Sequence, residues 1–204
     1  MLVVGLTGGV ASGKSTVSKV LKEEGAYLID ADQIARELVQ PHTPAWHELI
    51  KAFGKKILQK DGSIDRKRLA AIVFSDRKER NRLNQLLHPR IQEEIEGRLT
   101  RIRQTDPGAV VVVDAALLVE TGQYRQMDQV VVVRALEGQQ IERLEKRDGM
   151  SRSEARRIVS SQMSMKEKLK RADTVISNEG PIEQTRAEAR ALFKQLKRMA
   201  SEKV

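Results

Sequence analysis

The loop Gly8–Ser15 constrains this chain more than any other segment. Its eight residues fit the pattern G-x-x-x-x-G-K-[ST]. They follow an apolar run, Leu2–Thr7, and precede Thr16–Glu24, where apolar residues recur at helical spacing. A strand, a glycine-rich turn and a helix in this order are the context in which the pattern binds nucleotide phosphates. A flexible Gly/Ser linker is the alternative, but apolar segments abut the loop on both sides.

The residue types in this loop suit a polyphosphate. Glycines let backbone N–H groups converge in conformations that a Cβ would block. The helix that begins here adds unpaired N–H groups and the positive end of its dipole. Lys14 places a charge on the outer phosphates, and the Ser15 hydroxyl is placed to ligate Mg²⁺. We therefore expect nucleotide phosphates and Mg²⁺ at this loop.

Length and composition limit the class of protein. A chain of 204 residues with 40% hydrophobic residues can form one α/β domain with insertions. It has no cysteine, which excludes disulfides, thiolate metal sites and a thiol nucleophile. No apolar run approaches the roughly 18 to 20 residues of a membrane span, and the N-terminus shows no signal-peptide pattern. These features predict a soluble cytoplasmic protein without membrane contact.

The net charge of +9 is concentrated in one segment. Between Arg143 and Arg171 there are ten Lys and Arg residues against four Asp and Glu. Such a segment suits nucleic acid, a polyanionic small molecule, or a set of solvated helix faces. RNA binding usually adds aromatic stacking platforms, and this segment has no Phe, Tyr or Trp. The composition therefore favours phosphate chemistry, with no nucleic-acid partner.

Five apolar runs separated by helical patterns predict an α/β fold. Runs of this kind are typical of the buried strands of a mostly parallel sheet, and the intervening helices indicate βαβ crossovers. We expect five parallel strands flanked by helices, and an amphipathic last helix over Pro181–Met199. The expected strands are Leu2–Thr7, Ala26–Asp30, Ala109–Asp114, Gln129–Arg134 and Asp173–Ser177.

Two stretches do not follow this alternation of strands and helices. The first has only helical patterns and is too long for an ordinary crossover, so it predicts an inserted helical subdomain at about 41–103. The second is the basic segment, about 137–171, where Ser151-Arg152-Ser153-Glu154 is typical of a capping box. It predicts a helical hairpin that serves as a lid. The nucleotide-binding core then comprises about 1–40, 104–136 and 172–204.

Two carboxylates end the second predicted strand, in Asp30-Ala31-Asp32. If the strand persists, both face the same side at the carboxyl edge, where α/β sheets bind ligands. Asp32 is then the candidate to accept a hydroxyl proton. Alternatively, one of the two caps a helix that starts near Gln33, since Asp is a good N-cap.

Asp114 ends the most apolar strand. An acid at this place is typical of an aspartate that holds Mg²⁺ through water; otherwise it lies at the solvent edge of the strand. Glu120 follows six residues later and is expected to line the same cleft. Arg143 and Arg147 are four apart and share a helix face. They suit the charge of a transferring phosphoryl group, or they pair with nearby glutamates.

The three histidines lack metal-ligand spacing. His42 and His47 are expected to face solvent. His88 precedes Pro89, which is well placed to begin the helix that carries Ile91 and Ile95. A structural role is expected for His88 from this pattern alone.

Taken together, these residues resemble the dephospho-coenzyme A kinase family over nearly the whole chain. The loop pattern alone occurs in many families, but the full set in this order is specific. The matching motifs are Gly5–Thr16, Asp30-Ala31-Asp32 with Ala35-Arg36, His88-Pro89, the set Gln140, Arg143, Arg147, Gln162 and Lys168, and Ala172-Asp173 with Asn178.

The resemblance implies transfer of phosphate from ATP to the ribose 3′-hydroxyl of dephospho-coenzyme A. It implies a P-loop kinase fold with a nucleotide core, substrate-binding helices and a lid. The implied catalytic residues are Asp32, as the base, with Lys14, Arg143 and Arg147. The implied ATP-binding residues are Ala11, Ser12, Gly13, Lys14, Ser15, Thr16, Arg147 and Asn178. The implied substrate-binding residues are Asp32, Arg36, His88, Asp114 and Glu120, and the implied Mg²⁺ ligands are Ser15 and Asp114.

One stretch departs from the family pattern. The family usually has Asp-x-Pro-Leu-Leu-Phe-Glu after the third strand, whereas Ala116 and Val119 stand here in place of proline and phenylalanine. Both acids remain, so the departure affects the packing around the adenine or ribose of the substrate.

Three other functions fit parts of the sequence. A kinase for a nucleoside or nucleotide would share the core and differ in the inserted helices. A GTPase is disfavoured because no Asn-Lys-x-Asp tetrad is present. A basic RNA-binding protein with a vestigial loop would bind nucleic acid with a steep salt dependence and consume no ATP. The oligomeric state, the order of substrate binding and the contacts of the pantetheine arm are left open by the sequence.

Overall fold

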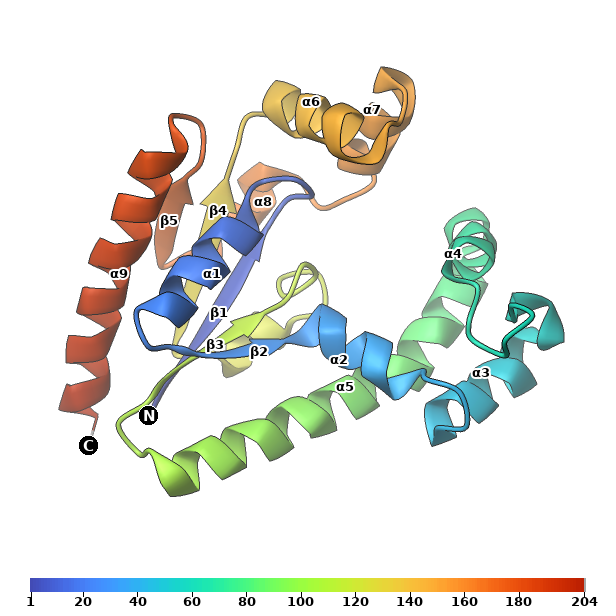
Figure 1. Cartoon of the computed structure of the whole chain (residues 1–204), viewed down its shortest axis with the longest axis horizontal. Coiled ribbons are helices and arrows are strands. Elements are labelled where there is room, and N and C mark those ends of the chain that lie inside the picture. Colours follow the sequence, from blue (N-terminus) through green and yellow to red (C-terminus); the bar gives the residue numbers. More distant parts are fainter. Residues whose placement is uncertain (204) are drawn as a thin grey trace. The chain divides into compact units, whose positions relative to one another are not determined.

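A five-stranded parallel sheet forms the centre of the first of two compact units. The computed structural model describes residues 1–203, except for the side chain of Phe74. The strand order is β2-β3-β1-β4-β5, and every pair is parallel (Figure 1). The fold class and all five strand positions are confirmed. The strands are β1 (Leu2–Gly8), β2 (Tyr27–Asp30), β3 (Val110–Asp114), β4 (Gln129–Arg134) and β5 (Thr174–Ser177).

Helices connect these strands and form the second unit. The first unit comprises Met1–Asp30 and the chain from Thr100 onward, and the second is Ala31–Leu99. The α-helices are α1 (Lys14–Glu23), α2 (Ala31–Leu38), α3 (Pro44–Phe53), α4 (Arg66–Ser75), α5 (Arg77–Thr105), α6 (Glu137–Asp148), α7 (Arg152–Ser160), α8 (Met165–Leu169) and α9 (Ile182–Glu202), with 3₁₀ turns η1 (Lys55–Ile57) and η2 (Gln123–Gln126). None of the described helices is long and apolar enough to cross a bilayer.

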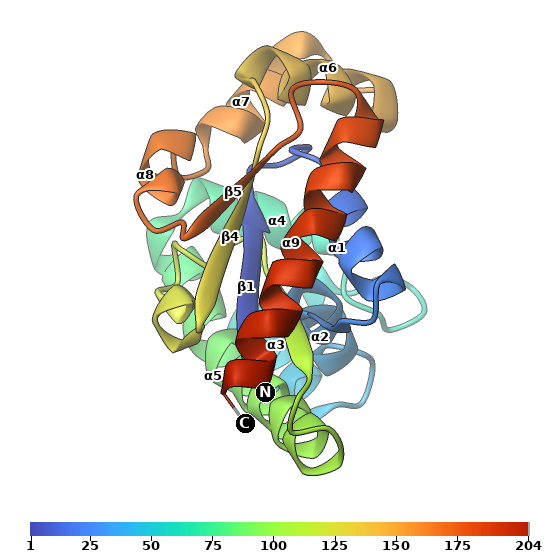
Figure 2. The same ribbon diagram turned by 90° about the vertical axis from the view of Figure 1, so that its left-hand side faces the viewer.

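Aliphatic side chains build the core of the first unit because aromatic residues are scarce. β1 and β3 are buried along their whole lengths, as expected for strands covered on both faces. Helices α1 and α9 lie side by side on one face of the sheet (Figure 2). Their apolar stripes join β1, β3 and β4 in one cluster, which includes Val17, Leu21, Ala189, Leu192 and Leu196.

The other face of β1 contacts the segment that follows β3. A Cβ at Gly5 would lie 2.5 Å from Leu118 Cδ2 and 2.8 Å from Met127 Cγ. This approach brings the 115–127 segment close against the strand that leads into the glycine-rich loop. A substitution at Gly5 would therefore push this segment away from β1.

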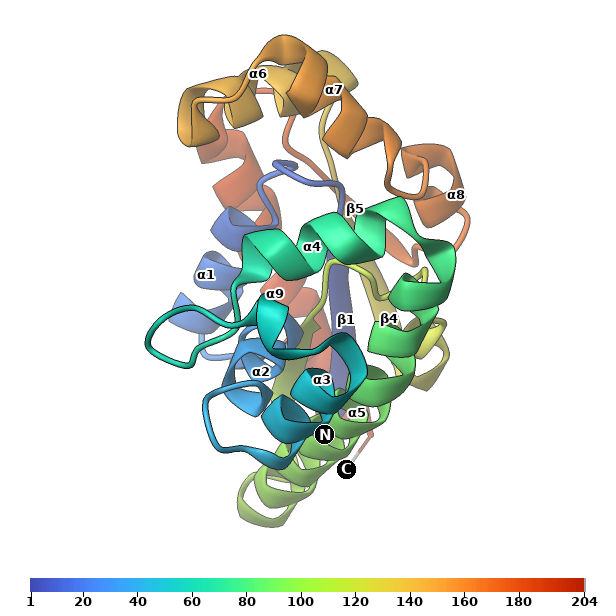
Figure 3. The ribbon, with the colours of Figure 1, turned by 90° about the vertical axis from the view of Figure 1, so that its right-hand side faces the viewer.

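The second unit has its own core, to which the helices α3, α4 and α5 and the turn η1 contribute. Figure 3 shows how these helices are arranged. Its buried members are Leu49, Phe53, Ile57, Ile64, Leu69 and Val73. Side chains cap two of the helices: Thr43 accepts from the Trp46 N–H at the start of α3, and Asp65 accepts from the Arg68 N–H at the start of α4. The unit therefore has both a core and defined helix ends. The subdomain bounds expected from the sequence stay a prediction.

Helix α5 corrects one expectation. Pro89 lies inside this helix and does not begin it. Proline lacks the N–H that would bond the carbonyl four residues earlier. The neighbouring carbonyl of Leu86 accepts from Arg90 Nη1 at 2.8 Å. This side-chain hydrogen bond supplements the ladder beside the proline, and the helix continues for sixteen residues to Thr105.

The basic segment folds as three helices, α6, α7 and α8. The capping box at Ser151 and Glu154 is confirmed at the start of α7. Helices α6 and α7 pack together through Ile141, Leu144 and Ala155. Val10 and Ala11 of the glycine-rich loop pack against the same cluster. The hairpin is thus attached to the loop that is expected to bind phosphates.

Candidate active site

The loop after β1 has the backbone of a phosphate cradle. Ala11 and Gly13 have φ values of 54° and 92°, in the left-handed region, and α1 begins directly after Gly13. A Cβ at Gly13 would lie 2.0 Å from Asn178 Nδ2. Glycine is therefore required there both by its conformation and by the close approach of Asn178. The Ser12 hydroxyl is buried without a hydrogen-bond partner among the described residues, as expected of a loop shaped for a ligand.

Three side chains distant in sequence hold this loop in place. Asn178 Nδ2 donates to the Ser12 carbonyl at 2.8 Å. Arg143 donates to the Ala11 carbonyl at 3.1 Å and to the Asn178 carbonyl at 2.9 Å. Gln162 Oε1 accepts from the Val10 N–H at 2.8 Å. The loop is therefore supported from α6, from the end of β5 and from the α7–α8 connection.

Lys14 and Asp114 form an ion pair beneath the loop. β3 pairs with β1, which places Asp114 opposite Leu6, close to the start of the loop. Burial raises the pKa of Asp114, and the charge of Lys14 opposes that shift. Asp30 lies opposite Asp114 on β2, and its charge raises the pKa of Asp114 further. The alternative of an acid at the solvent edge does not apply, because Asp114 is 4% exposed.

Ser15 and Asp114 fit a Mg²⁺ ion that is bound together with a nucleotide. Mg²⁺ is usually held by one or two carboxylates, a hydroxyl and substrate phosphates, and it keeps several waters. No cluster of three or more His, Cys, Asp or Glu side chains suited to a metal occurs among the described residues. An all-protein cage is therefore absent from that part of the chain, whereas the Ser15 hydroxyl and the Asp114 carboxylate supply the hard oxygens that this ion prefers.

Asp32 lies in the second unit, in the first turn of α2. β2 ends at Asp30 and the helix starts at Ala31, so the expected continuation of the strand through Asp32 is wrong. The helix also starts two residues earlier than Gln33, so Asp32 does not cap it, whereas Asp30 is the residue directly before its start. Asp32 lines a cavity of about 300 Å³. The other lining residues are Ala35, Arg36, Val39, Leu49, Arg66, Leu69 and Leu87.

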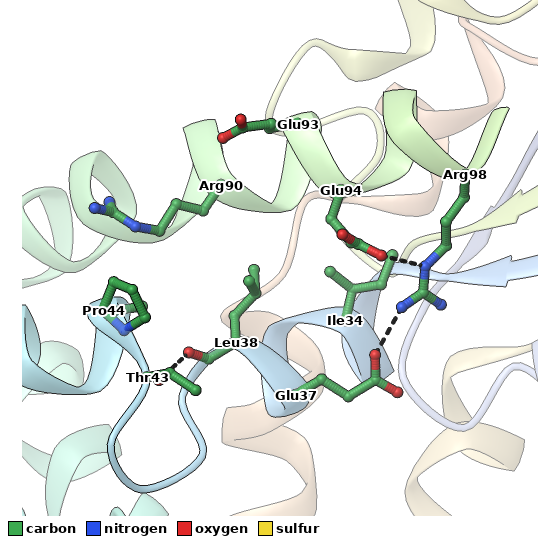
Figure 4. Close-up of a pocket in the computed structure, with 10 residues that line it drawn as sticks. Ile34, Glu37, Leu38, Thr43, Pro44, Arg90, Glu93, Glu94 and Arg98 are labelled. Atoms are coloured by element: carbon green, nitrogen blue, oxygen red, sulfur yellow. Dashed lines mark hydrogen bonds and ion pairs between the residues drawn. The ribbon is translucent and has the colours of Figure 1, made fainter. Parts of the chain in front are cut away.

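A second cavity, of about 500 Å³, lies on the opposite face of α2 (Figure 4). Each residue turns a helix by about 100°, so Ile34 and Glu37 point away from the Asp32 face. The guanidinium of Arg98 on α5 is held at 2.7 Å by Glu94 and at 2.7 Å by Glu37. The hydrogen bond from Arg98 lowers the pKa of Glu37. The charge of Arg98 is therefore already neutralised by two carboxylates of the second unit.

Glu120 pairs with a buried lysine. Lys168 Nζ on α8 donates to both Glu120 oxygens, at 2.6 and 2.8 Å, and to the Ala116 carbonyl at 3.1 Å. Thr7 Oγ1 donates to the same carbonyl at 3.2 Å. The Lys168 side chain is only 1% exposed. The substrate-binding role expected for Glu120 stays a prediction, and both of its oxygens are occupied by Lys168.

Replacement of Lys168 by methionine should destabilise the protein. The variant leaves the Glu120 carboxylate, which is 20% exposed, without its cation. Breaking a buried pair costs about 3–5 kcal/mol, and the partial exposure of Glu120 lowers our expectation to about 2–4 kcal/mol. Urea unfolding measures the loss. The double variant K168M/E120Q should be more stable than K168M, because no buried charge is left over. A single variant as stable as the wild type would contradict this account.

Arg147 and His88, two other expected site residues, make none of the hydrogen bonds described above that hold the glycine-rich loop. Arg147 makes a two-point contact with its neighbour Asp148, at 2.8 and 2.7 Å. His88 is half-buried on α5, and burial lowers its pKa, which favours the neutral imidazole. Among the described residues, neither makes a hydrogen bond or ion pair with another expected site residue, and their roles stay predictions.

Sequence reasoning did not single out Arg66 or the ion pair of Lys168. Arg66 is the first residue of α4, where a charged side chain is typical of a solvent-exposed helix face. Only the folded second unit shows that it lines the same cavity as Asp32. Lys168 lies in a segment rich in exposed lysines. The motif matches did include Lys168 and Gln162, which was the one available signal that these two differ from their neighbours.

The sheet order, the glycine-rich loop and the partly buried Lys14–Asp114 pair define a protein of the P-loop kinase class. Solved structures agree with this class. The chain superposes with a TM-score of 0.51 on a shikimate kinase from Acinetobacter baumannii, at 16% identity over 96% of this chain and 93% of the other, which shows the fold alone. The TM-score rises to 0.82 for the protein TT1252 from Thermus thermophilus, at 30% identity over 96% and 97% of the two chains.

The chain belongs to the dephospho-CoA kinase family. The family model described as dephospho-CoA kinase matches residues 2–184. A relative of that name from Moorella thermoacetica is 44% identical over 97% of this chain and 93% of its own length. Another from Geobacter sulfurreducens is 47% identical over 90% and 93%. The resemblance seen in the motifs is thus confirmed across nearly the full chain.

Proposed function

We propose that this protein transfers the γ-phosphoryl group of ATP to the ribose 3′-hydroxyl of dephospho-coenzyme A, the last step of coenzyme A biosynthesis. Family membership supports the substrate pair. The observation that supports ATP as the phosphoryl donor is the loop after β1. It has two residues in the left-handed region and the partly buried Lys14–Asp114 ion pair beneath it. The observation on the acceptor side is the cavity in which the Asp32 carboxylate lies.

The groups of the loop act on ATP. The N–H groups of Ala11–Thr16 bind the phosphates, and Lys14 moves its charge from Asp114 to the outer phosphates when ATP enters. Ser15 and Asp114 would hold Mg²⁺, which neutralises charge on the β- and γ-phosphates. Burial raises the pKa of Asp114 and the charge of Lys14 opposes that shift, so once Lys14 turns to the phosphates, a bound Mg²⁺ would take over its part in keeping this acid ionised.

Asp32 acts on the acceptor. Its carboxylate takes the proton of the 3′-hydroxyl as that oxygen bonds to the γ-phosphorus and the bond to the bridging oxygen of ADP breaks. ADP leaves with the electron pair, and the product carries a 3′-phosphate. Neither Asp32 oxygen has a hydrogen-bond or ion-pair partner among the residues that the structure describes, so the carboxylate is available to accept a proton.

The helices α6 to α8 act as a lid over the transferring group. Arg143 is already at the loop, on the Ala11 carbonyl. Arg147 is at the end of the same helix and exchanges Asp148 for phosphate when the lid closes. We assign the loop around Asn178 to the adenine of ATP, as the resemblance to the family implies. A cytoplasmic location fits a cysteine-free enzyme that consumes ATP.

A panel of acceptors tests this proposal. The purified protein with ATP and Mg²⁺ is offered dephospho-coenzyme A, adenosine, other nucleosides and shikimate, and transfer of labelled phosphate is measured. Dephospho-coenzyme A should be the preferred acceptor by kcat/KM, with the label at the 3′-oxygen. Preference for a nucleoside would assign the rival kinase function. Nucleic-acid affinity without ATP consumption would assign the RNA-binding one.

A further inference from the structure

The two cavities of the second unit differ in the charge that they offer a ligand. One lies on the face of α2 that carries Asp32, and we call it the Asp32 cavity. The other lies on the opposite face around Arg98, and we call it the Arg98 cavity (Figure 4). A substrate that carries a diphosphate needs cationic groups that are not already neutralised. The ion pairs of each cavity therefore decide which of them suits such a substrate.

The cations of the Arg98 cavity are already paired. Arg98 is shared between Glu37 and Glu94. Arg90 donates to Glu48 at 2.6 Å. Glu93 adds a further negative charge to the lining. A diphosphate in this cavity would meet a surplus of carboxylates, so the Arg98 cavity does not suit it.

The Asp32 cavity presents two arginines, Arg36 and Arg66, without acidic partners among the described residues. Arg66 is the first residue of α4, directly after Asp65. The Asp65 carboxylate is engaged by Arg68, through the backbone N–H at 3.0 Å and the side-chain Nε at 3.0 Å. Asp65, the nearest acid in sequence, therefore pairs with Arg68, and the charge of the Arg66 guanidinium is available to an anionic ligand.

The rest of the lining is apolar. Leu49, Leu69 and Leu87 come from three different helices and contribute to this cavity together with Val39. Leu49 and Leu69 belong to the core of the second unit. Two arginines and one carboxylate on an aliphatic lining suit a ligand with an anionic group, a hydroxyl and a flat or aliphatic body.

We propose that Arg66, together with Arg36, binds the diphosphate of the acceptor and so orients its ribose toward Asp32. This inference rests on the proposed function. Guanidinium groups bind phosphate oxygens through two parallel hydrogen bonds. The diphosphate is attached to the same ribose that carries the 3′-hydroxyl, so anchoring it next to Asp32 restricts where that hydroxyl lies. Arg66 is thus a substrate-binding residue of the second unit and takes no part in proton transfer.

The variant Arg66→Ala tests this assignment, with Lys67→Ala as the matched control. Lys67 is the next residue on α4, is exposed and carries the same charge, but it does not line the cavity. R66A should raise the KM for dephospho-coenzyme A by about 10-fold or more, as expected for the loss of charge-assisted hydrogen bonds. The KM for ATP and the kcat should change little, and K67A should behave like the wild type.

Two further readouts separate substrate binding from a structural role. The KM of R66A should depend less on salt than that of K67A, because a charge–phosphate contact is lost. Arg66→Lys should restore part of the affinity. An R66A enzyme with the KM and salt dependence of K67A would overturn the inference. A wild-type enzyme that does not phosphorylate dephospho-coenzyme A would overturn the proposed function instead.

Discussion

Replacement of Lys14 by alanine should reduce phosphoryl transfer by about 10³-fold or more, since the charge removed acts on the group that is transferred. Initial rates with saturating dephospho-coenzyme A measure the loss. ATP affinity should fall as well, because Lys14 contributes to binding the outer phosphates. A variant with near wild-type turnover would show that the loop does not hold the reacting phosphates.

The fold should survive this change. Lys14 pairs with Asp114 in the structure, and its removal would leave a buried carboxylate without its cation. Burial already raises the pKa of Asp114, so the acid can take up a proton and need not remain as an isolated charge. A thermal melt of K14A checks this point. Lys19→Ala is the matched control, because Lys19 is an exposed lysine on the same helix that pairs with Glu23.

Local patterns predicted the sheet, because each strand is a short run of aliphatic residues with a helical pattern on either side. The strand over Gln129–Arg134 was predicted to the residue. The end of β2 was not, because the sequence Asp30-Ala31-Asp32 is compatible with both an extended strand and a first helical turn. Propensity does not separate these outcomes, and the helix dipole favours the acid in the first turn.

Pro89 is a second position at which a local rule predicted the wrong helix boundary. Proline is common at the first turn of a helix, and that local rule predicted a helix start. Inside α5, packing of Ile95 and Leu99 and the hydrogen bond from Arg90 to the Leu86 carbonyl accompany a continuous helix across it. The hydrogen bond from Arg90 is local, but the burial of Ile95 and Leu99 depends on residues that are distant in sequence, so the local rule for proline could not take it into account.

The candidate site was predictable where one motif holds all its parts, and unpredictable where the parts come from different elements. Gly13 and Lys14 could be named from the loop pattern. The pairing of Lys14 with Asp114 needed the β1–β3 neighbourhood, which no spacing encodes. The same holds for Glu120, whose partner Lys168 lies far along the chain, and for Arg66, which meets Asp32 only across the second unit.

Asp32→Asn should lower kcat by about 10²- to 10⁴-fold, the usual contribution of a positioned general base. Asparagine keeps the shape of the side chain but cannot accept the hydroxyl proton. Stability should fall only slightly, because an exposed acid in the first turn of a helix contributes about 0.3–1 kcal/mol. Single-turnover rates measure the chemical step, and ATP affinity should be unchanged.

The control for this variant lies on the other face of the same helix. Glu37→Gln removes the same charge from α2, but Glu37 faces Arg98 and the other cavity. Its kcat should stay close to that of the wild type. If D32N and E37Q lower kcat equally, the loss of a negative charge from α2 explains both effects, and Asp32 is not the base. If D32N weakens ATP or acceptor binding while kcat holds, Asp32 positions substrate, and proton removal then requires another group.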